Sequence, residues 1–292
     1  FPLWAEHGLT PAGLFPEVLS LDHDELSRPS TRVRVQARQT YVFAEAYRLG
    51  WKRETAQRLA EAGVSILTGP ALAPNGLPGR ILAADGSGLT DAAADLYDIA
   101  FTLFALAEAA RGPVGAEACL PAANAILERL DRLTADLVHG GYEEGIPAPP
   151  MRLQNPHMHL LEACLSLARS DPRADHLARA AGIVKLFDTR FTAGPGGLLG
   201  EKFQPDWSMP SGEAAEIVEP GHQFEWVWLL HTHARAVNQP APEAMQRLYS
   251  FAVSTLDEAG RACQEVTRAG APHDASRRTW PQTETPAAAS MC

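Results

Sequence analysis

The chain has little of what marks a secreted, membrane-spanning or nucleic-acid-binding protein. Its four cysteines are scattered and form no CxxC pair, which favours a reducing cytoplasm over a disulfide framework. No apolar run reaches the roughly 18 residues that a membrane span needs. Acidic residues outnumber basic ones by 35 to 25, and the net charge of −10 argues against nucleic-acid or membrane partners. Neither a Rossmann nor a P-loop fingerprint opens a predicted helix, so no nucleotide cofactor is indicated.

What the chain does have is apolar content and helical patterning. Its 292 residues are 46% hydrophobic, enough for one sizeable domain or two small ones, and we predict one domain over residues 1–292. The patterning predicts helices over 30–49, 53–67, 91–110, 117–137 and 242–256, with further helix starts at 155, 171, 220 and 281. Connections are short within each pair of helices and long between pairs, and the longest, 192–218, has room for short strands. Repeated helical hairpins of this kind predict an α/α solenoid or a closed α/α barrel.

Three of the predicted helix starts rest on capping residues. Ser30 is a candidate cap for the first long helix. Asn155–Pro156 and Asp171–Pro172 each combine a capping side chain with proline at the first helical position.

A period of about sixty residues runs through the chemistry of the chain. Polar and aromatic clusters recur near predicted helix starts, with gaps of 59, 62, 63 and 58 residues, at Arg38, Tyr97, Asn155–His159, His222–Glu225 and Trp280–Glu284. A fixed period of this size indicates a repeated supersecondary unit. One cluster per repeat, at the same place in each, predicts that the clusters converge on one site.

Each cluster also has a purely structural interpretation. His222 at a helix start is held neutral by the helix dipole and can accept a proton at physiological pH, or it simply caps the helix. Asn155 and His159 share a helix face, yet an asparagine cap and a structural histidine explain them as well. The two-residue spacing of His157 and His159 makes a metal site on one helix face unfavourable.

The remaining candidates suit a sugar ligand. Trp280 with Glu284 makes an aromatic platform beside a hydroxyl acceptor, or else a core anchor beside a solvated acid. Glu225 can bind a hydroxyl or tune His222. Tyr97 is a core candidate whose hydroxyl can reach the cavity, and Arg38 gains weight only from its place in the period.

Together these segments resemble the N-acylglucosamine 2-epimerase family, which includes mannose isomerase and cellobiose 2-epimerase. The matching segments occur in the family's order: Gln36-Ala37-Arg38, Tyr97-Asp98-Ile99-Ala100-Phe101, Asn155-Pro156-His157-Met158-His159, Pro220-Gly221-His222-Gln223-Phe224-Glu225-Trp226 and Trp280-Pro281-Gln282-Thr283-Glu284. The resemblance implies an all-α (α/α)6 barrel and cofactor-free, metal-free proton transfer on an open-chain monosaccharide.

The resemblance also implies roles by position. His222 would be the catalytic acid/base, assisted by Glu225, with His159 as a further catalytic-site residue. The implied substrate-binding residues are Arg38, Tyr97, Asn155, Trp280 and Glu284. Both a monomer and a homo-oligomer stay open.

One feature departs from the family pattern. The family carries a second catalytic histidine on its last inner helix, which the period would place beyond Cys292. We therefore expect a barrel whose last hairpins are missing or truncated, and a form of the enzyme that is impaired.

Several functions compete on this basis. An aldose–ketose isomerase of the D-mannose/D-fructose type is preferred, because the segment from Glu219 to Trp226 resembles the mannose-isomerase branch most. A 2-epimerase and a non-catalytic sugar-binding remnant are the alternatives. A glycosidase is distant, since it needs two facing carboxylates and the clusters here are led by histidine, arginine and aromatic residues.

Overall fold

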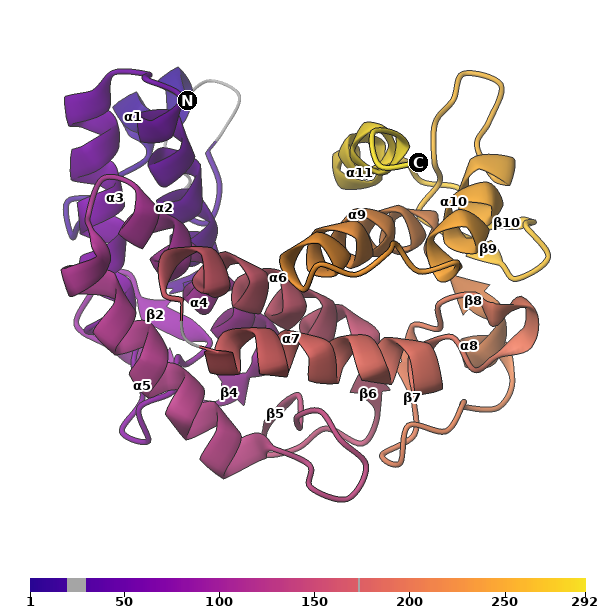
Figure 1. The fold of residues 1–292 in the computed structure, drawn as a ribbon. Helices are drawn as coiled ribbons and strands as arrows, with labels where there is room; N and C mark the ends of the chain where they lie inside the picture. The colour runs from indigo at the N-terminus through magenta and orange to yellow at the C-terminus, as the bar shows by residue number, and fades with distance from the viewer. Residues whose placement is uncertain (20–29, 173) are drawn as a thin grey trace. The chain divides into compact units, whose positions relative to one another are not determined.

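The protein, seen here in a computed structural model, is described over residues 1–19, 30–172 and 174–292 and is mostly helical (Figure 1). Its residues fall into two compact units. Unit 1 comprises Phe1–Asp136, Tyr142–Pro149 and Glu162–His176, and unit 2 comprises Leu137–Gly141, Pro150–Leu161 and Leu177–Cys292. The single domain expected over residues 1–292 stays a prediction.

Unit 1 is built from helical hairpins. Its helices are α1 (Pro2–His7), α2 (Val33–Arg48), α3 (Arg53–Leu67), α4 (Leu96–Arg111) and α5 (Ala116–Thr134), with the second half of α6 (Gln154–Ser170) and the start of α7 (Ala174–Leu186). α2 packs against α3 and α4, and α4 packs against α5. Almost every residue of α4 is buried, which makes it a central helix of this unit.

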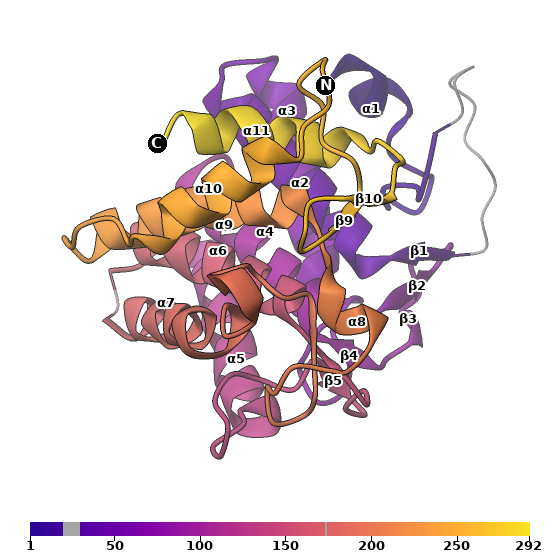
Figure 2. The ribbon, with the colours of Figure 1, turned by 90° about the vertical axis from the view of Figure 1, so that its right-hand side faces the viewer.

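Unit 2 repeats the hairpin pattern with longer connections. Besides the remaining parts of α6 and α7 it contains α8 (Glu213–Glu216), α9 (Pro220–Ala236), α10 (Ala244–Ser254) and α11 (Thr279–Ala289), a π-helical turn at Phe187–Phe191 and a 3-10 turn at Pro195–Gly197. α9 packs against both α10 and α11, which lie beside it in Figure 2.

Short antiparallel strands occupy the long connections. Unit 1 has the sheet β1 (Ser30–Arg32), β2 (Ile81–Ala83), β3 (Leu89–Asp91) and the pair β4 (Ala94–Asp95), β5 (Gly145–Ile146); unit 2 has the pair β6 (Arg152–Leu153), β7 (Lys202–Phe203) and the sheet β8 (Ile217–Val218), β9 (Glu265–Thr267), β10 (Pro272–Asp274). Strands β1, β4, β6 and β8 each lead directly into a helix, namely α2, α4, α6 and α9. Short strands therefore fix where these helices begin, and the strands expected within 192–218 are confirmed.

Strand pairing overrides two predicted helix starts. Ser30 caps no helix, because it opens β1 and pairs with Ala83. The helix predicted from Asp91 begins only at Leu96, after β3 and β4, and Asp95 caps it by accepting the backbone N–H of Tyr97.

Other helix boundaries shift by a few residues. α5 ends at Thr134 rather than near Leu137, and α6 begins at Gln154, one residue before the predicted cap. The prediction at Asp171–Pro172 is wrong by a few residues, since α7 begins at Ala174, and residue 173 lies outside the described residues.

A glutamine at the fourth position of three helices clasps the backbone of the preceding connection. The three are Gln36 in α2, Gln223 in α9 and Gln282 in α11, which clasp Phe15, Leu199 and Ala262. In each case the amide oxygen accepts the backbone N–H and the amide nitrogen donates to the backbone carbonyl. The sixty-residue period therefore has a structural basis besides the candidate site, because the same side chain recurs at the same place.

None of the helices in the described part of the chain is both long enough and apolar enough to cross a bilayer.

Removing one glutamine clasp tests its contribution to stability. Gln36 is fully buried, so Gln36→Met leaves the N–H of Phe15 without its partner and leaves the carbonyl of Phe15 with only the hydroxyl of Thr31 as donor. We expect the free energy of unfolding in urea to fall by about 2–4 kcal/mol. Gln57→Met is the matched control, since Gln57 bonds only Glu61 on the surface and should change stability by about 0.5 kcal/mol or less. Equal effects of the two variants would contradict the clasp.

Candidate active site

The candidate residues occupy two equivalent positions in their helices. Arg38, His159, Glu225 and Glu284 each lie five residues after the first residue of α2, α6, α9 and α11. Tyr97, Asn155 and Trp280 each lie one residue after the start of α4, α6 and α11, and His222 lies two residues after the start of α9. Residues four apart share a helix face, so the period seen in the sequence places chemistry on one face of each helix.

His222 forms the centre of the cluster in unit 2, together with a carboxylate that sequence reasoning missed. The ring is 4% exposed, and its Nδ1 lies 2.8 Å from Oε2 of Glu201. Strands β6 and β7 pair Leu153 with Lys202, which brings Glu201, the residue before β7, beside the start of α6. The Gln223 clasp on Leu199 further ties this connection to α9. A carboxylate twenty-one residues before His222 carries no local signal of this pairing.

Glu201 accepts hydrogen bonds on both of its oxygens. Oε2 accepts from His222 and from Nε2 of Gln154 at 2.9 Å, and Oε1 accepts from the backbone N–H of Glu219 at 3.1 Å. Burial by itself would raise the pKa of Glu201, but the charge of His222 and these donors lower it. The donors on both oxygens and the charge of His222 therefore favour the carboxylate form of Glu201.

The electrostatics correct the expectation of a neutral histidine at the helix start. Burial of the ring lowers the pKa of His222, but the charges of Glu201 and then Glu219 raise it, to about 10 overall. Oε1 of Glu219 lies 3.8 Å from Nδ1, and burial raises the pKa of this second carboxyl to about 7. Two nearby carboxylates therefore outweigh the helix dipole and favour the imidazolium form of His222.

The other ring nitrogen of His222 contacts Asn155. Nδ2 of Asn155 lies 3.1 Å from Nε2, an arrangement that suits a neutral ring, whereas the charges around Nδ1 favour a protonated one. The charges favour the protonated ring, and Oδ1 of Asn155 is buried without a hydrogen-bond partner in the present amide orientation. Turning the amide over brings Oδ1 to an Nε2–H donor, so Asn155 can serve both protonation states. A capping asparagine uses Oδ1, so the prediction that Asn155 caps α6 is wrong.

Glu201, Glu219 and His222 also offer three metal-ligand atoms within 4.8 Å of one another. A metal there would have to displace the Nδ1 proton that lies between His222 and Glu201. The donor set therefore fits a hydrogen-bonded ion pair better than a metal centre.

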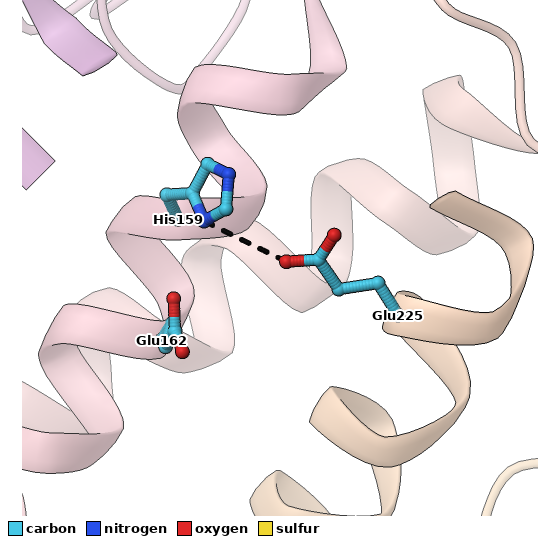
Figure 3. A group of neighbouring side chains, drawn as sticks. All are labelled: His159, Glu162 and Glu225. Atoms are coloured by element: carbon cyan, nitrogen blue, oxygen red, sulfur yellow. Dashed lines mark ion pairs between the residues drawn. The ribbon is translucent and has the colours of Figure 1, made fainter. Parts of the chain in front are cut away.

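His159 and Glu225 face each other across α6 and α9. Nδ1 of His159 is 3.6 Å from Oε1 of Glu225, and Figure 3 shows the two side chains pointing toward one another. Both are buried, at 9% and 7% exposure. Glu162 stands one turn further along α6 (Figure 3). His157 points elsewhere, against the ring of Trp207, as its spacing predicts.

Trp280 packs against the start of α9. Its ring centroid lies 5.0 Å from that of His222, and a Cβ on Gly221 would come within 2.4 Å of its indole ring. Only glycine at position 221 leaves room for this approach. Glu284, one turn after Trp280, accepts the indole N–H of Trp228 at 3.0 Å.

The remaining two candidates belong to unit 1. Arg38 donates to the hydroxyl of Tyr97, and its guanidinium lies 4.3 Å from the ring centroid of Phe101. Arg34, one turn earlier on α2, is bonded to Asp98 by both Nε and an Nη. Arg34 is therefore ion-paired to a carboxylate of α4, whereas Arg38 contacts the hydroxyl and aromatic rings of that helix.

Comparison with known proteins decides the family. Residues 13–292 match the N-acylglucosamine 2-epimerase (GlcNAc 2-epimerase) family. The chain belongs to this family. A mannose-6-phosphate isomerase of Rhizobium meliloti (strain 1021) is 35% identical over 97% of the chain and 74% of its own length. A D-mannose isomerase of Thermobifida fusca is 31% identical over 71% of the chain and 54% of its own length.

The solved structures agree on the fold. The crystal structure of a D-mannose isomerase aligns with a TM-score of 0.88 and 21% identity, over 99% of this chain and 78% of the other. The fold is the (α/α)6 barrel of these sugar isomerases and epimerases, as the family resemblance implied. By family, the chain is an isomerase or epimerase of carbohydrates.

Replacing Glu201 tests the origin of the His222 pKa. Glu201→Gln removes the negative charge nearest to His222. It also places an amide NH2 group opposite at least one of the groups that donate hydrogen bonds to Glu201. We expect the pKa of His222 to fall well below 10, so the imidazolium is lost at a lower pH, as followed by NMR titration of the histidine rings. Glu213→Gln, at a side chain that is 78% exposed, is the control and should leave this titration unchanged. A His222 that still titrates near 10 without Glu201 would contradict the pairing.

Adding a methyl group at Gly221 tests the placement of Trp280. Gly221→Ala should push the indole away from His222 and raise KM for the sugar more than it changes kcat. Gly182→Ala in α7 is the control, because a Cβ there meets nothing within 4 Å and a helical alanine is favoured by up to about 1 kcal/mol. An unchanged KM for the sugar in Gly221→Ala, measured by steady-state kinetics, would show that sugar binding does not depend on the close contact between Trp280 and Gly221.

Proposed function

We propose that the chain is an aldose–ketose isomerase of the D-mannose/D-fructose type that works through an enediol intermediate. The observation that carries this proposal is His222. Its Nδ1 is held by Glu201, which leaves Nε2 as the ring atom that can exchange a proton with a substrate. The two relatives named as isomerases of mannose or its phosphate support the same choice.

The proposed reaction needs one base and nearby hydrogen-bond donors. In the neutral form of His222, Nε2 takes the proton from C2 of the open-chain aldose, and the C–H electrons form the C1–C2 double bond as the carbonyl oxygen at C1 takes a proton from the ring of His159. Returning the proton from Nε2 to C1, while the hydroxyl at C2 gives its own proton back to the ring of His159, yields the ketose and restores both histidines. Glu201 stabilises the imidazolium that exists between the two transfers.

The other candidates are proposed to bind and orient the sugar. His159 and Asn155 present donors to sugar oxygens, and Glu225 and Glu284 accept its hydroxyl protons. We extend the proposal to Trp280 as an aromatic surface beside His222, and to Arg38 and Tyr97 of unit 1 as ligands of sugar oxygens.

The proposal includes no metal and no cofactor, because every step is assigned to a side chain of this protein. It also places the enzyme in the cytoplasm, since its four cysteines are free thiols and three of them are buried.

Incubation with D-mannose in D2O, followed by NMR, tests the proposed activity. We expect fructose to form with solvent deuterium in the product, and mannose 6-phosphate in a parallel incubation separates a free from a phosphorylated sugar. Glucose without fructose would assign a 2-epimerase instead, the alternative that the family name favours. Binding of both sugars without product or exchange would identify a sugar-binding protein and overturn the proposal.

His222→Asn identifies the proton carrier in the same assay. Removing the base should lower the exchange rate by about 10²- to 10⁴-fold while the helical circular dichroism and the thermal transition are retained. His231→Asn on the same helix is the control and should keep the activity. Full exchange in His222→Asn would rule out His222 as the base.

A further inference from the structure

A chain of buried side chains runs from Trp226 to His222. The indole N–H of Trp226 donates to Oε1 of Gln154 at 2.7 Å, and Nε2 of Gln154 donates to Oε2 of Glu201 at 2.9 Å. The same carboxylate oxygen lies 2.8 Å from Nδ1 of His222. Trp226 and Gln154 are both fully buried. The series of contacts starts and ends on α9, where Trp226 lies one turn after His222.

The chemistry of the four groups allows only one direction of donation. An indole nitrogen is a donor and never an acceptor, so the amide of Gln154 must turn its oxygen toward Trp226. Its NH2 group then faces Glu201, which as a carboxylate can only accept. Nδ1 of His222, bonded to the same carboxylate, must therefore carry a proton. An isolated amide can flip and an isolated neutral imidazole can change tautomer, which reverses the direction of hydrogen-bond donation. Within this series of contacts neither change is possible.

Packing fixes the position of the Trp226 indole, whose N–H is the first donor in the series. The ring of Trp226 stacks on Phe187 with centroids 4.6 Å apart and meets Phe191 edge-on at 6.0 Å. The backbone also holds Gln154 in register, because its N–H donates to the carbonyl of Glu201. The donor thus has a fixed position and a fixed orientation.

We infer that Gln154 and Trp226 are positioning residues that keep the proton of the neutral His222 ring on Nδ1 and free Nε2 for the sugar. This inference rests on the proposed role of His222 as the acid/base. Neither residue is assigned a contact with the sugar in that proposal, and both act only through Glu201.

NMR of protein labelled with ¹⁵N-histidine, without sugar, tests the inference directly. The variants are Gln154→Met, which keeps the shape and loses both hydrogen bonds, and Trp226→Phe, which loses only the N–H. On the alkaline side of the His222 titration, the wild type should show the proton on Nδ1 alone, with His222→Asn assigning the signals. We expect both variants to populate the two tautomers, and kcat to fall roughly 10- to 100-fold with KM changed less than about twofold.

The double variant and a matched control separate positioning from general destabilisation. Because Gln154 and Trp226 act in one series, Gln154→Met with Trp226→Phe should be no slower than Gln154→Met alone. Trp207→Phe removes another buried indole N–H in unit 2, which donates to the carbonyl of Gly140, and should leave the His222 signals unchanged.

Wild-type His222 signals in both single variants would overturn the inference, even if their activity fell. Effects that multiply in the double variant would overturn it as well. The ring signals are read without substrate, so a failure of the proposed sugar chemistry would appear separately, as a wild type with ordered tautomers and no turnover.

Discussion

The candidate site depends on one buried charge pair, between Glu201 and His222. Removing two charged groups from water costs free energy unless each group is hydrogen-bonded to polar partners in the interior. Glu201 meets this condition with donors on both oxygens, and His222 meets it with Glu201 on one nitrogen and Asn155 on the other. The neighbouring elements, from the β6–β7 pair to the glutamine clasp on Leu199, hold the two groups in this geometry. Breaking one of these hydrogen bonds would leave a buried charge without a polar partner.

Repetition explains how much of this arrangement the sequence could reveal. The same position of α2, α6, α9 and α11 carries Arg38, His159, Glu225 and Glu284, and a sixty-residue period makes that regularity visible without a structure. Hairpins with short internal turns and long outer connections likewise predict an α/α solenoid or a closed barrel, and the family and the solved structures decide for the barrel. Patterns of this kind can be recognised in the sequence because helical periodicity and loop length are properties of neighbouring residues.

What the sequence could not reveal depends on contacts between distant residues. Glu201 lies in a long connection with no helical pattern, and only the pairing of two-residue strands brings it to His222. The protonation of His222 was mispredicted for the same reason, since the helix dipole is a local feature and the two carboxylates are not. Ser30 was assigned to a helix because its partner, Ala83, is more than fifty residues away in the chain. Strand pairs this short leave almost no signal in their own composition.

The central claim is that a single histidine moves one proton between C1 and C2 on one face of the sugar. The stereochemistry of deuterium at C1 of fructose formed from mannose in D2O tests it most directly. Transfer by His222 alone predicts deuterium in only one of the two C1 positions, because Nε2 approaches the planar enediol from one side. Deuterium divided equally between the two positions would show delivery from both faces and would contradict the account.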